Sequence, residues 1–204
     1  METEKKHHWE NIFQNKTPEE VSWTETYPKV SINMIQALNL DKTAPIIDVG
    51  GGDSLLADAL LELGYSDISV LDISGKALER AKKRIGSRAS EIQWIESDII
   101  KFKPLKKYSL WHDRASFHFL IDQKDIKIYT DLLEKAEVKF LVIGTFSVNG
   151  PEKCSGLPVT QYDCISLENC FSKTFTSLEC LELDHTTPFN TQQEFIFSRL
   201  ERIL

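Results

Sequence analysis

The stretch APIIDVGGGDS, residues 44–54, constrains the fold more than any other part of this 204-residue chain. A short apolar run ends in three consecutive glycines, Gly50, Gly51 and Gly52, and polar residues follow them. Such a run is typical of a buried strand that leads through a tight turn into a helix. Glycines at this turn let the backbone approach a ligand, and the next helix adds N–H groups without intrahelical partners.

Strand-like and helix-like segments alternate through most of the chain. The further predicted strands are DISVLDIS (67–74), EIQWIESDI (91–99), YSLWHD (108–113) and VKFLVIGTF (138–146). The predicted helices are KVSINMIQAL (29–38), DSLLADALLELG (53–64), GKALERAKKRIG (75–86) and QKDIKIYTDLLEKA (123–136). Because these strands are apolar almost throughout and helices separate them, they indicate a parallel sheet covered on both faces.

The C-terminal part of the chain departs from this alternation. A short helix is predicted around 166–171, and two strands near 173–185 and 192–200 are joined by TTPFN. Two strands with so short a connection are expected to be antiparallel. We therefore predict a doubly wound α/β fold with a mainly parallel sheet and a C-terminal antiparallel hairpin. Residues 28–204 are expected to form the main domain and residues 1–27 an N-terminal arm or cap.

Charge, apolar content and cysteine usage argue against several classes of protein. The formal net charge is −7, and non-specific nucleic-acid binding needs clustered Lys and Arg. No apolar run approaches the roughly 20 residues of a membrane span. The N-terminal METEKKHHWE lacks the apolar segment of a signal peptide. A cytoplasmic protein is expected, with reduced thiols at Cys154, Cys164, Cys170 and Cys180 and no metal site, because no C-x-x-C pair occurs.

Two acidic residues stand in register with the glycine loop. The loop fails the dinucleotide fingerprint Gly-x-Gly-x-x-Gly because Leu55 takes the place of the third glycine. It matches Asp-x-Gly-x-Gly-x-Ser, from Asp48 to Ser54. At the end of the second strand, Asp72 can accept hydrogen bonds from two ribose hydroxyls. At the end of the third strand, Asp98 is placed to contact an amino group such as that of adenine.

Each of these features also has a purely structural interpretation. The sole role of the glycines could be to make a tight turn, and Asp98 could cap the turn that follows it. Asp72 could cap a helix, although Ser74 is the better N-cap. All three features in this order favour a ligand site.

With these residues in this order, the chain resembles the class I S-adenosylmethionine-dependent methyltransferases over roughly residues 28–200. The resemblance implies a Rossmann-like sheet of seven strands that ends in an antiparallel hairpin. It also implies the roles of the cofactor-binding residues: Asp48, Gly50, Gly51 and Gly52 under the methionine part, Asp72 at the ribose, Ile73 packed on adenine, and Asp98 with Ile99 at the adenine edge.

The N-terminal segment WENIFQNKTPEEVSW, residues 9–23, adds to the resemblance. It is similar to the corresponding segment of small-molecule and lysine methyltransferases, in which an aromatic residue closes over the cofactor. Trp23 is the candidate for this role, whereas Trp9 is expected to anchor the arm on the core. Two positions depart from the family pattern. EKAEVKF stands before the fifth strand, where the family usually has Pro-Gly-Gly, and Ser109 stands in the fourth strand, where it usually has an acid. Neither is expected to touch the cofactor pocket, so these departures concern the class of acceptor more than cofactor binding.

Ionisable residues gather in SLWHDRASFHFL, residues 109–120. In open α/β sheets ligands bind at the carboxyl ends of the strands, so His112 is expected beside the cofactor. Asp113, Arg114 and His118 are the candidate catalytic residues. Asp113 would hold the cofactor's amino group or the nucleophile, His118 would act as the base, and Arg114 would bind an anionic group of the acceptor. The structural alternative pairs Asp113 with Arg114 and makes His118 a helix cap.

The sequence therefore predicts methyl transfer from S-adenosylmethionine to a small polar metabolite or a protein side chain. One alternative is a catalytically silent S-adenosylmethionine-binding partner protein, which would not need ionisable residues after the fourth strand. The other is a nicotinamide-dependent dehydrogenase, and Leu55 argues against it.

Overall fold

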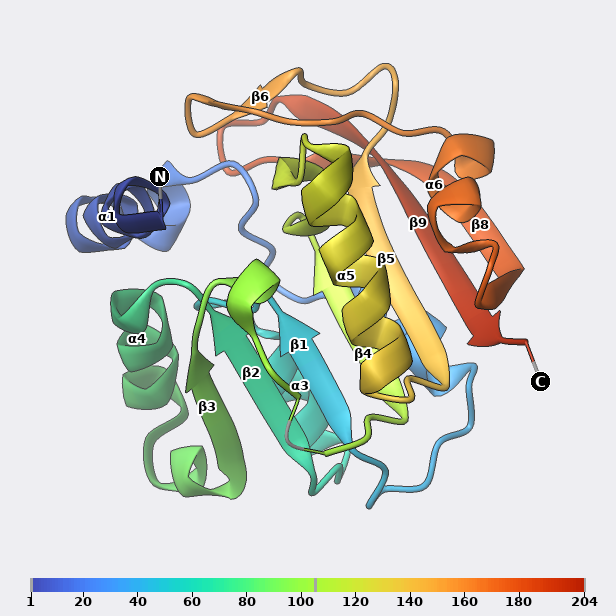
Figure 1. The fold of residues 1–204 in the computed structure, drawn as a ribbon. Coiled ribbons are helices and arrows are strands. Elements are labelled where there is room, and N and C mark those ends of the chain that lie inside the picture. Colours follow the sequence, from blue (N-terminus) through green and yellow to red (C-terminus); the bar gives the residue numbers. More distant parts are fainter. Residues whose placement is uncertain (1, 105, 204) are drawn as a thin grey trace.

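A sheet of seven strands, in the order β3-β2-β1-β4-β5-β9-β8, forms the centre of the computed structural model, which describes residues 2–104 and 106–203 (Figure 1). The parallel strands are β1 (Ile46–Val49), β2 (Ile68–Asp72), β3 (Ile92–Glu96), β4 (Leu110–Arg114) and β5 (Phe140–Phe146). Strand β9 (Gln192–Arg202) runs antiparallel to both β5 and β8 (Phe175–Thr186). The predicted fold class is confirmed.

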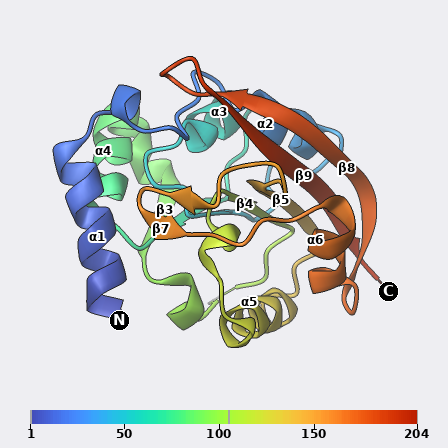
Figure 2. The ribbon, with the colours of Figure 1, turned by 90° about the horizontal axis from the view of Figure 1, so that it is seen from above.

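Helices cover both faces of this sheet (Figures 1 and 2). One face carries α2 (Lys29–Gln36), α3 (Leu56–Glu62) and α4 (Gly75–Ile85), and the other carries α5 (Gln123–Lys135) and α6 (Cys164–Phe171). Short 3₁₀ turns are η1 (Pro18–Glu20), η2 (Gly86–Glu91), η3 (Ile99–Lys101) and η4 (Phe117–Phe119). As predicted, the Ser74 hydroxyl caps α4 by accepting the N–H of Ala77.

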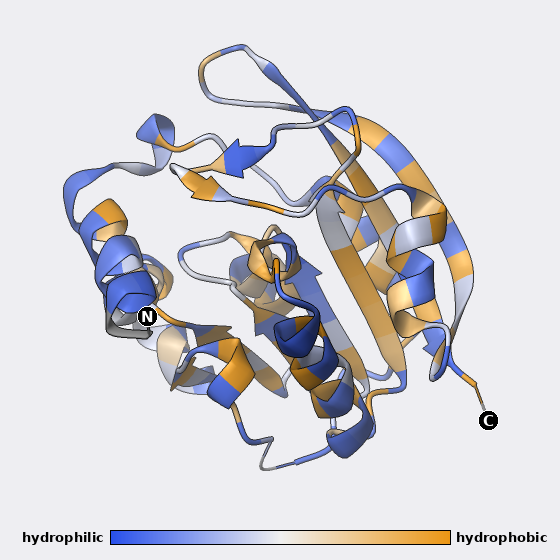
Figure 3. Cartoon of the chain, turned by 45° about the horizontal axis from the view of Figure 1, so that its top comes forward, coloured by the Kyte–Doolittle hydropathy of each residue, from blue (hydrophilic) through white to orange (hydrophobic). Residues whose placement is uncertain are grey.

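The core consists of two apolar clusters, one on each face of the sheet. Successive side chains of a strand point to opposite faces, so Leu110 packs with α2 and α3 whereas Trp111 packs with α5. Figure 3 shows the consequence: the central strands are mostly hydrophobic, and the outer side of α5 is mostly hydrophilic. Continuous apolar strands in the sequence are therefore explained by burial on both faces.

The N-terminal segment begins with α1 (Glu2–Asn15), which lies beside α4 (Figures 1 and 2). The Glu10 carboxylate accepts the N–H of Gly75 at 2.8 Å, and Arg80 donates to the carbonyls of Phe13 and Lys16 at 3.1 and 3.0 Å. These bonds attach α1 to the start and the middle of α4. Across the described residues, none of the helices combines the length and the apolarity that crossing a membrane requires.

The loop after β5 contains a small hairpin, β6 (Lys153–Cys154) and β7 (Leu157–Pro158), which sequence analysis did not predict. Its two turn residues, Ser155 and Gly156, have φ of 49° and 81°, as a tight two-residue hairpin turn requires. Figure 2 shows the hairpin lying across the carboxyl ends of the parallel strands. Residues 153–158 therefore form part of the cover above the sheet.

A disulfide between Cys164 and Cys180 corrects the prediction of four reduced cysteines. It joins the start of α6 to β8, with the two Cα atoms 6.0 Å apart. Cys154 and Cys170 are free thiols. The sequence shows the separation of 16 residues, but only the packing of α6 on β8 brings these two side chains together.

Candidate functional site

A cavity of about 470 Å³ lies at the carboxyl ends of β1, β2, β3 and β4. All ten residues predicted to bind the cofactor line it: Trp23, Asp48, Gly50, Gly51, Gly52, Asp72, Ile73, Asp98, Ile99 and His112. Of the three predicted catalytic residues, only Arg114 is part of the lining. The structure thus brings the cofactor set together, while the roles of these residues toward a cofactor stay predictions.

Close packing explains the glycines of the loop after β1. Gly50 and Gly52 have φ of 66° and 48°, a region that strains other residues. A Cβ on Gly50 would lie 2.5 Å from that of Ser116, and one on Gly51 would lie 2.5 Å from Oδ2 of Asp48. Larger residues would displace either the turn after β4 or the Asp48 carboxylate.

Asp72, the last residue of β2, and Asp98, the N-cap of η3, both line the cavity. Asp72 accepts the N–H of Ser74 at 2.8 Å, and burial raises the pKa of its carboxyl to about 7. Asp98 accepts the N–H of Ile100 through Oδ1, whereas its Oδ2 is buried without a hydrogen-bond partner. A ligand that donates hydrogen bonds at these two positions would satisfy the carboxylates.

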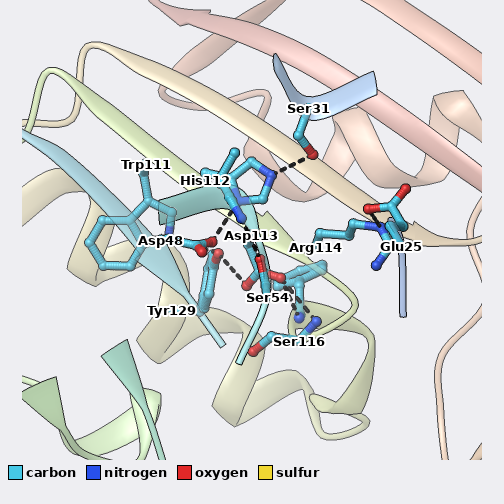
Figure 4. Close-up of polar contacts among 12 residues, drawn as sticks. Glu25, Ser31, Asp48, Ser54, Trp111, His112, Asp113, Arg114, Ser116 and Tyr129 are labelled. Carbon is cyan, nitrogen blue, oxygen red and sulfur yellow. Dashed lines mark hydrogen bonds and ion pairs between the residues drawn. The ribbon is translucent and has the colours of Figure 1, made fainter. Parts of the chain in front are cut away.

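Asp48, His112 and Ser31 form a hydrogen-bonded chain in the cavity wall (Figure 4). Nδ1 of His112 lies 2.7 Å from Oδ1 of Asp48, and Nε2 lies 2.8 Å from the Ser31 hydroxyl. Both ring nitrogens of His112 therefore have protein partners. A ligand could therefore contact His112 directly only at the faces of its ring, or indirectly through the Ser31 hydroxyl.

Arg114 pairs with Glu25 and not with Asp113. Its Nη1 donates to the carbonyl of Trp23 at 2.8 Å, and its Nε lies 3.3 Å from Oε2 of Glu25. The guanidinium also stands over the ring of Phe195, 5.1 Å from the centroid. Burial raises the pKa of Glu25 and lowers that of Arg114, while the attraction between their charges opposes both shifts. This pair connects β4 to the segment that covers the cavity.

Asp113 faces the opposite side of the sheet, so its predicted catalytic role does not fit the structure. Its Oδ1 accepts the N–H groups of Ser116 and Phe117 at 3.0 Å, and its Oδ2 accepts the Tyr129 hydroxyl at 2.9 Å (Figure 4). Burial raises the pKa of Asp113 to about 6. Successive residues of β4 alternate between the two faces of the sheet, so Asp113 faces α5 while His112 and Arg114 face the other side. On that face its carboxylate fixes the turn after β4 and joins the turn to α5.

His118 also lies outside the cavity lining, which corrects its prediction as the general base. Its Nδ1 accepts the N–H of Phe146 at 3.3 Å, and its ring stacks on that of Phe146 at 4.6 Å. Burial lowers the pKa of His118 to about 3, with a further lowering by the charge of Arg114. A ring this poor in proton affinity and closed off from the cavity fits a role in packing.

Aromatic side chains from distant parts of the sequence meet over the cavity. Trp9 lies between Trp23 and Phe119, with ring centroids 5.9 and 5.2 Å away, and Phe13 lies 6.3 Å from Trp23. All four line the cavity. Trp9 was expected to anchor the arm on the core, and its contribution to the cavity wall becomes visible only once α1 is placed.

Several other lining residues were not predicted from the sequence, among them Ser31, Glu25 and Phe119. Ser31 had a weak signal, because it is a polar residue within the apolar pattern KVSINMI of α2. Glu25 had none, since a single acid in a polar arm is unremarkable. Cys154, predicted only as a reduced thiol, also lines the cavity, and burial raises the pKa of its thiol to about 11.

Comparison with known proteins places a methyltransferase domain over the centre of the chain. Residues 46–135 match a family model described as "Methyltransferase domain". The chain is 26% identical over 125 residues to the eEF1A lysine and N-terminal methyltransferase of Mus musculus, covering 59% of this chain and 17% of that protein. It is 31% identical over 87 residues to malonyl-[acyl-carrier protein] O-methyltransferase 2 of Ilyobacter polytropus, covering 42% and 33%.

The same fold occurs among solved structures. The crystal structure of an S-adenosylmethionine-dependent methyltransferase from Anabaena variabilis aligns with a TM-score of 0.75 at 14% identity, covering 99% of this chain and 95% of that one. The match spans the whole fold, whereas the chain covers at most a third of the length of the two curated relatives above.

Proposed function

Because this chain has the fold and the methyltransferase domain of the class I S-adenosylmethionine-dependent methyltransferases, we propose that it transfers a methyl group from S-adenosylmethionine to an acceptor that is a small polar metabolite or a protein side chain. The proposal rests above all on one observation: the glycine loop, Asp72 and Asp98 line one cavity, in the order that the resemblance requires. The named relatives methylate a protein and a carrier-bound small molecule, so both acceptor classes stay within the proposal.

The residues present fit the cofactor chemically. Asp72 offers carboxylate oxygens to the ribose hydroxyls, and the buried Oδ2 of Asp98 lacks a donor such as the adenine amino group would supply. Ile73 and Ile99 offer apolar contacts to the adenine ring. The Gly50–Gly52 backbone provides the close approach that the methionine part needs. When bound, the cofactor supplies a methyl group on a positively charged sulfur.

The rest of the cavity wall would orient the acceptor and exclude water. Trp9 of α1 contacts both Trp23 and Phe119 of η4, which supports the N-terminal segment, residues 1–27, as the proposed cap. Arg114 is the proposed contact for an anionic group of the acceptor, and its bond to the Trp23 carbonyl couples this contact to the cap. An enzyme of this kind works mainly by alignment of the reacting groups, and a closed aromatic cover favours that.

Cofactor binding is the first test. S-adenosylmethionine and S-adenosylhomocysteine should each raise the melting temperature, by about 5–10 °C at a hundredfold excess over Kd, since ligand binding to the folded state alone adds about 2.7 kcal/mol. Nicotinamide dinucleotides serve as the control and should leave the transition where it is. Unchanged melting at saturating S-adenosylmethionine would contradict the proposal. Transfer of a labelled methyl group to components of a cell extract then identifies the acceptor class.

A further inference from the structure

Three elements of the fold build the chain of hydrogen bonds from Asp48 to Ser31 (Figure 4). Asp48 and His112 face each other across β1 and β4, where their Cα positions are paired in the sheet register. Ser31 comes from α2, which covers this face. The exposed fractions of the three residues are only 2%, 3% and 1%, yet all of them line the cavity. Two hydrogen bonds of 2.7 and 2.8 Å link the three side chains, and the chain ends at the Ser31 hydroxyl in the cavity lining. Cofactor binding alone does not explain this arrangement.

The order of donors along the chain follows from elementary chemistry. An ionised carboxylate accepts hydrogen bonds only, so Asp48 requires the hydrogen of the neutral His112 ring to be on Nδ1. Nε2 is then an acceptor, and the Ser31 hydroxyl must donate its hydrogen to it. As a result Ser31 turns its oxygen lone pairs, and not its hydrogen, toward the cavity.

We propose that Asp48, His112 and Ser31 form a proton relay that takes up the proton lost by the methyl acceptor. This inference rests on the proposed function. As the acceptor heteroatom forms its bond to the methyl carbon, the sulfur keeps the electron pair of the broken S–C bond. The acceptor's proton passes to Oγ of Ser31 while the Ser31 proton passes to Nε2 of His112. The imidazolium that results is balanced by the Asp48 carboxylate, and its proton leaves to solvent after the reaction.

The relay defines the class of acceptor. A group that presents an N–H or O–H can donate a hydrogen bond to Ser31 before the reaction and lose that proton during it. A carboxylate has no proton to release and offers only lone pairs, which would meet those of Ser31. The structure therefore points to an amine or hydroxyl acceptor. Ser31 would contact this group directly, whereas His112 and Asp48 are positioning residues that act through it.

Other charged groups around His112 do not take its place. Glu25 and Asp113 lie within electrostatic reach of the ring, and Arg114 lies within reach of Asp48. Glu25 is held at Arg114, and Asp113 accepts three hydrogen bonds on the far side of the sheet. Among the described residues that line the cavity, the Asp48–His112–Ser31 chain thus combines a proton acceptor, a carrier and a neutralising charge in one connected path.

Nitrogen-15 NMR of the histidine rings tests the relay without any acceptor. In the complex with S-adenosylhomocysteine, the His112 ring should carry a hydrogen on Nδ1 and none on Nε2. The signals are assigned among the five histidines by comparison with His112→Gln. Asp48→Asn keeps the shape but can donate to Nδ1, so it should move the hydrogen to Nε2. A doubly protonated ring in the wild type, or hydrogen on Nε2, would overturn the proposal.

Calorimetry separates this inference from the proposed function. Ser31→Ala should bind S-adenosylhomocysteine within about threefold of the wild type, because the hydroxyl serves the acceptor. Ser69→Ala is the matched control, since Ser69 is a buried serine of β2 outside the cavity lining, with its hydroxyl bonded to Gln93. A loss above tenfold in Ser31→Ala alone would assign the hydroxyl to the cofactor and overturn the relay. Failure of the wild type to bind would instead refute the proposed function.

Methyl transfer to small probes tests the acceptor class. Simple amines and phenols should be methylated, at rates that fall by about 10²–10⁴ in Ser31→Ala, as expected for the loss of a general base. Ser31→Cys retains a proton donor at this position and should recover part of the rate. Transfer to acetate that is equally fast in the wild type and in Ser31→Ala would contradict the assignment.

Discussion

The carboxyl ends of β2 and β4 each hold a buried aspartate, and the two differ in what surrounds them. Asp72 is 7% exposed and Asp113 is 0% exposed. Burial raises the pKa of both carboxyls, to about 7 and about 6. Asp72 nevertheless lines the cavity, whereas Asp113 faces α5 and accepts three hydrogen bonds from Ser116, Phe117 and Tyr129.

This difference shows that burial and a shifted pKa do not by themselves mark a reacting group. Perturbed acids occur at functional sites and in structural networks alike. The two aspartates differ in whether their carboxylate oxygens can accept further hydrogen bonds from a ligand in the cavity. Asp72 would complete its hydrogen bonding with a ligand, while Asp113 has completed it within the protein. Substitutions at the two positions should therefore affect different measured quantities.

Asp113→Ala should have the largest effect, and on stability. It leaves two backbone N–H groups and the Tyr129 hydroxyl buried without an acceptor, each at a cost of about 1–3 kcal/mol. We expect the free energy of unfolding to fall by about 3–5 kcal/mol and the melting temperature by about 10 °C. Denaturant titration measures the first quantity and calorimetric melting the second.

The same variant provides the contrast in binding. The folded fraction of Asp113→Ala should bind S-adenosylhomocysteine within about threefold of the wild type, because the carboxylate does not line the cavity. Asp131→Ala, on the exposed side of α5, is the stability control, since its ion pair with Lys127 is solvent-exposed and such pairs contribute little. A variant with normal melting and weak binding would reverse our assignment of Asp113.

Asp72→Ala should change affinity more than stability. Loss of the acceptor for two ribose hydroxyls should weaken the binding of S-adenosylhomocysteine by about ten- to a hundredfold, or 1.4–2.7 kcal/mol. Removal of a buried carboxylate with a raised pKa offsets the lost bond to the Ser74 N–H, so melting should change little. Asp67→Ala, at the other end of β2, is the control for calorimetry. Equal affinity in both variants would support a cap role for Asp72 alone.

The smallest expected effect is on the pH dependence of stability, where His118 can be compared with the two aspartates. The pKa of its ring is about 3 when folded and about 6.5 when unfolded, so between these values only the unfolded chain binds the proton. Its contribution to stability is complete above pH 6.5 and is lost as the pH falls toward 3. Asp72 and Asp113 act in the opposite direction, because their raised pKa values make the folded state take up protons first.

The difference between the wild type and a variant isolates the histidine. On going from pH 7.5 to 5.5, the wild type should lose roughly 1 kcal/mol more unfolding free energy than His118→Gln, which cannot take up the proton. Urea titrations of both proteins at the two pH values measure this. Parallel losses would mean that the ring is protonated in the folded protein, and would reopen the question of its access to the cavity.

The residues predicted to bind the cofactor all line one cavity, whereas of the three predicted to act on the acceptor only Arg114 does. The loop at Gly50–Gly52, Asp72 and Asp98 all follow directly after strands, and the carboxyl ends of parallel strands meet at one edge of the sheet. Local order along the chain therefore predicts their neighbourhood. Glu25, Ser31 and Cys154 come from a loop, a helix and a hairpin whose positions depend on packing, so no local pattern could assign them to the same wall.

Alternation within β4 explains why Asp113, Arg114 and His118, which were predicted to act together, do not meet at one site: of the three, only Arg114 lines the cavity. Apolar residues on both faces of this strand hide which side of the sheet each polar side chain takes. Once α2 lies on one face and α5 on the other, His112 and Arg114 point to the first and Asp113 to the second. His118 follows the turn and is covered by Phe146.

The sequence by itself determined the alternating strands and helices, the glycine turn and the two acids beside it, because hydrophobic period, turn chemistry and position after a strand are local properties. Only the tertiary structure decided that Ser31 meets His112 across 81 residues, that Arg114 pairs with Glu25, and that Cys164 bonds to Cys180. These contacts join segments that hydrophobic burial brings together. The local apolar pattern determines which faces of the elements pack, but it does not specify which polar atoms will meet there.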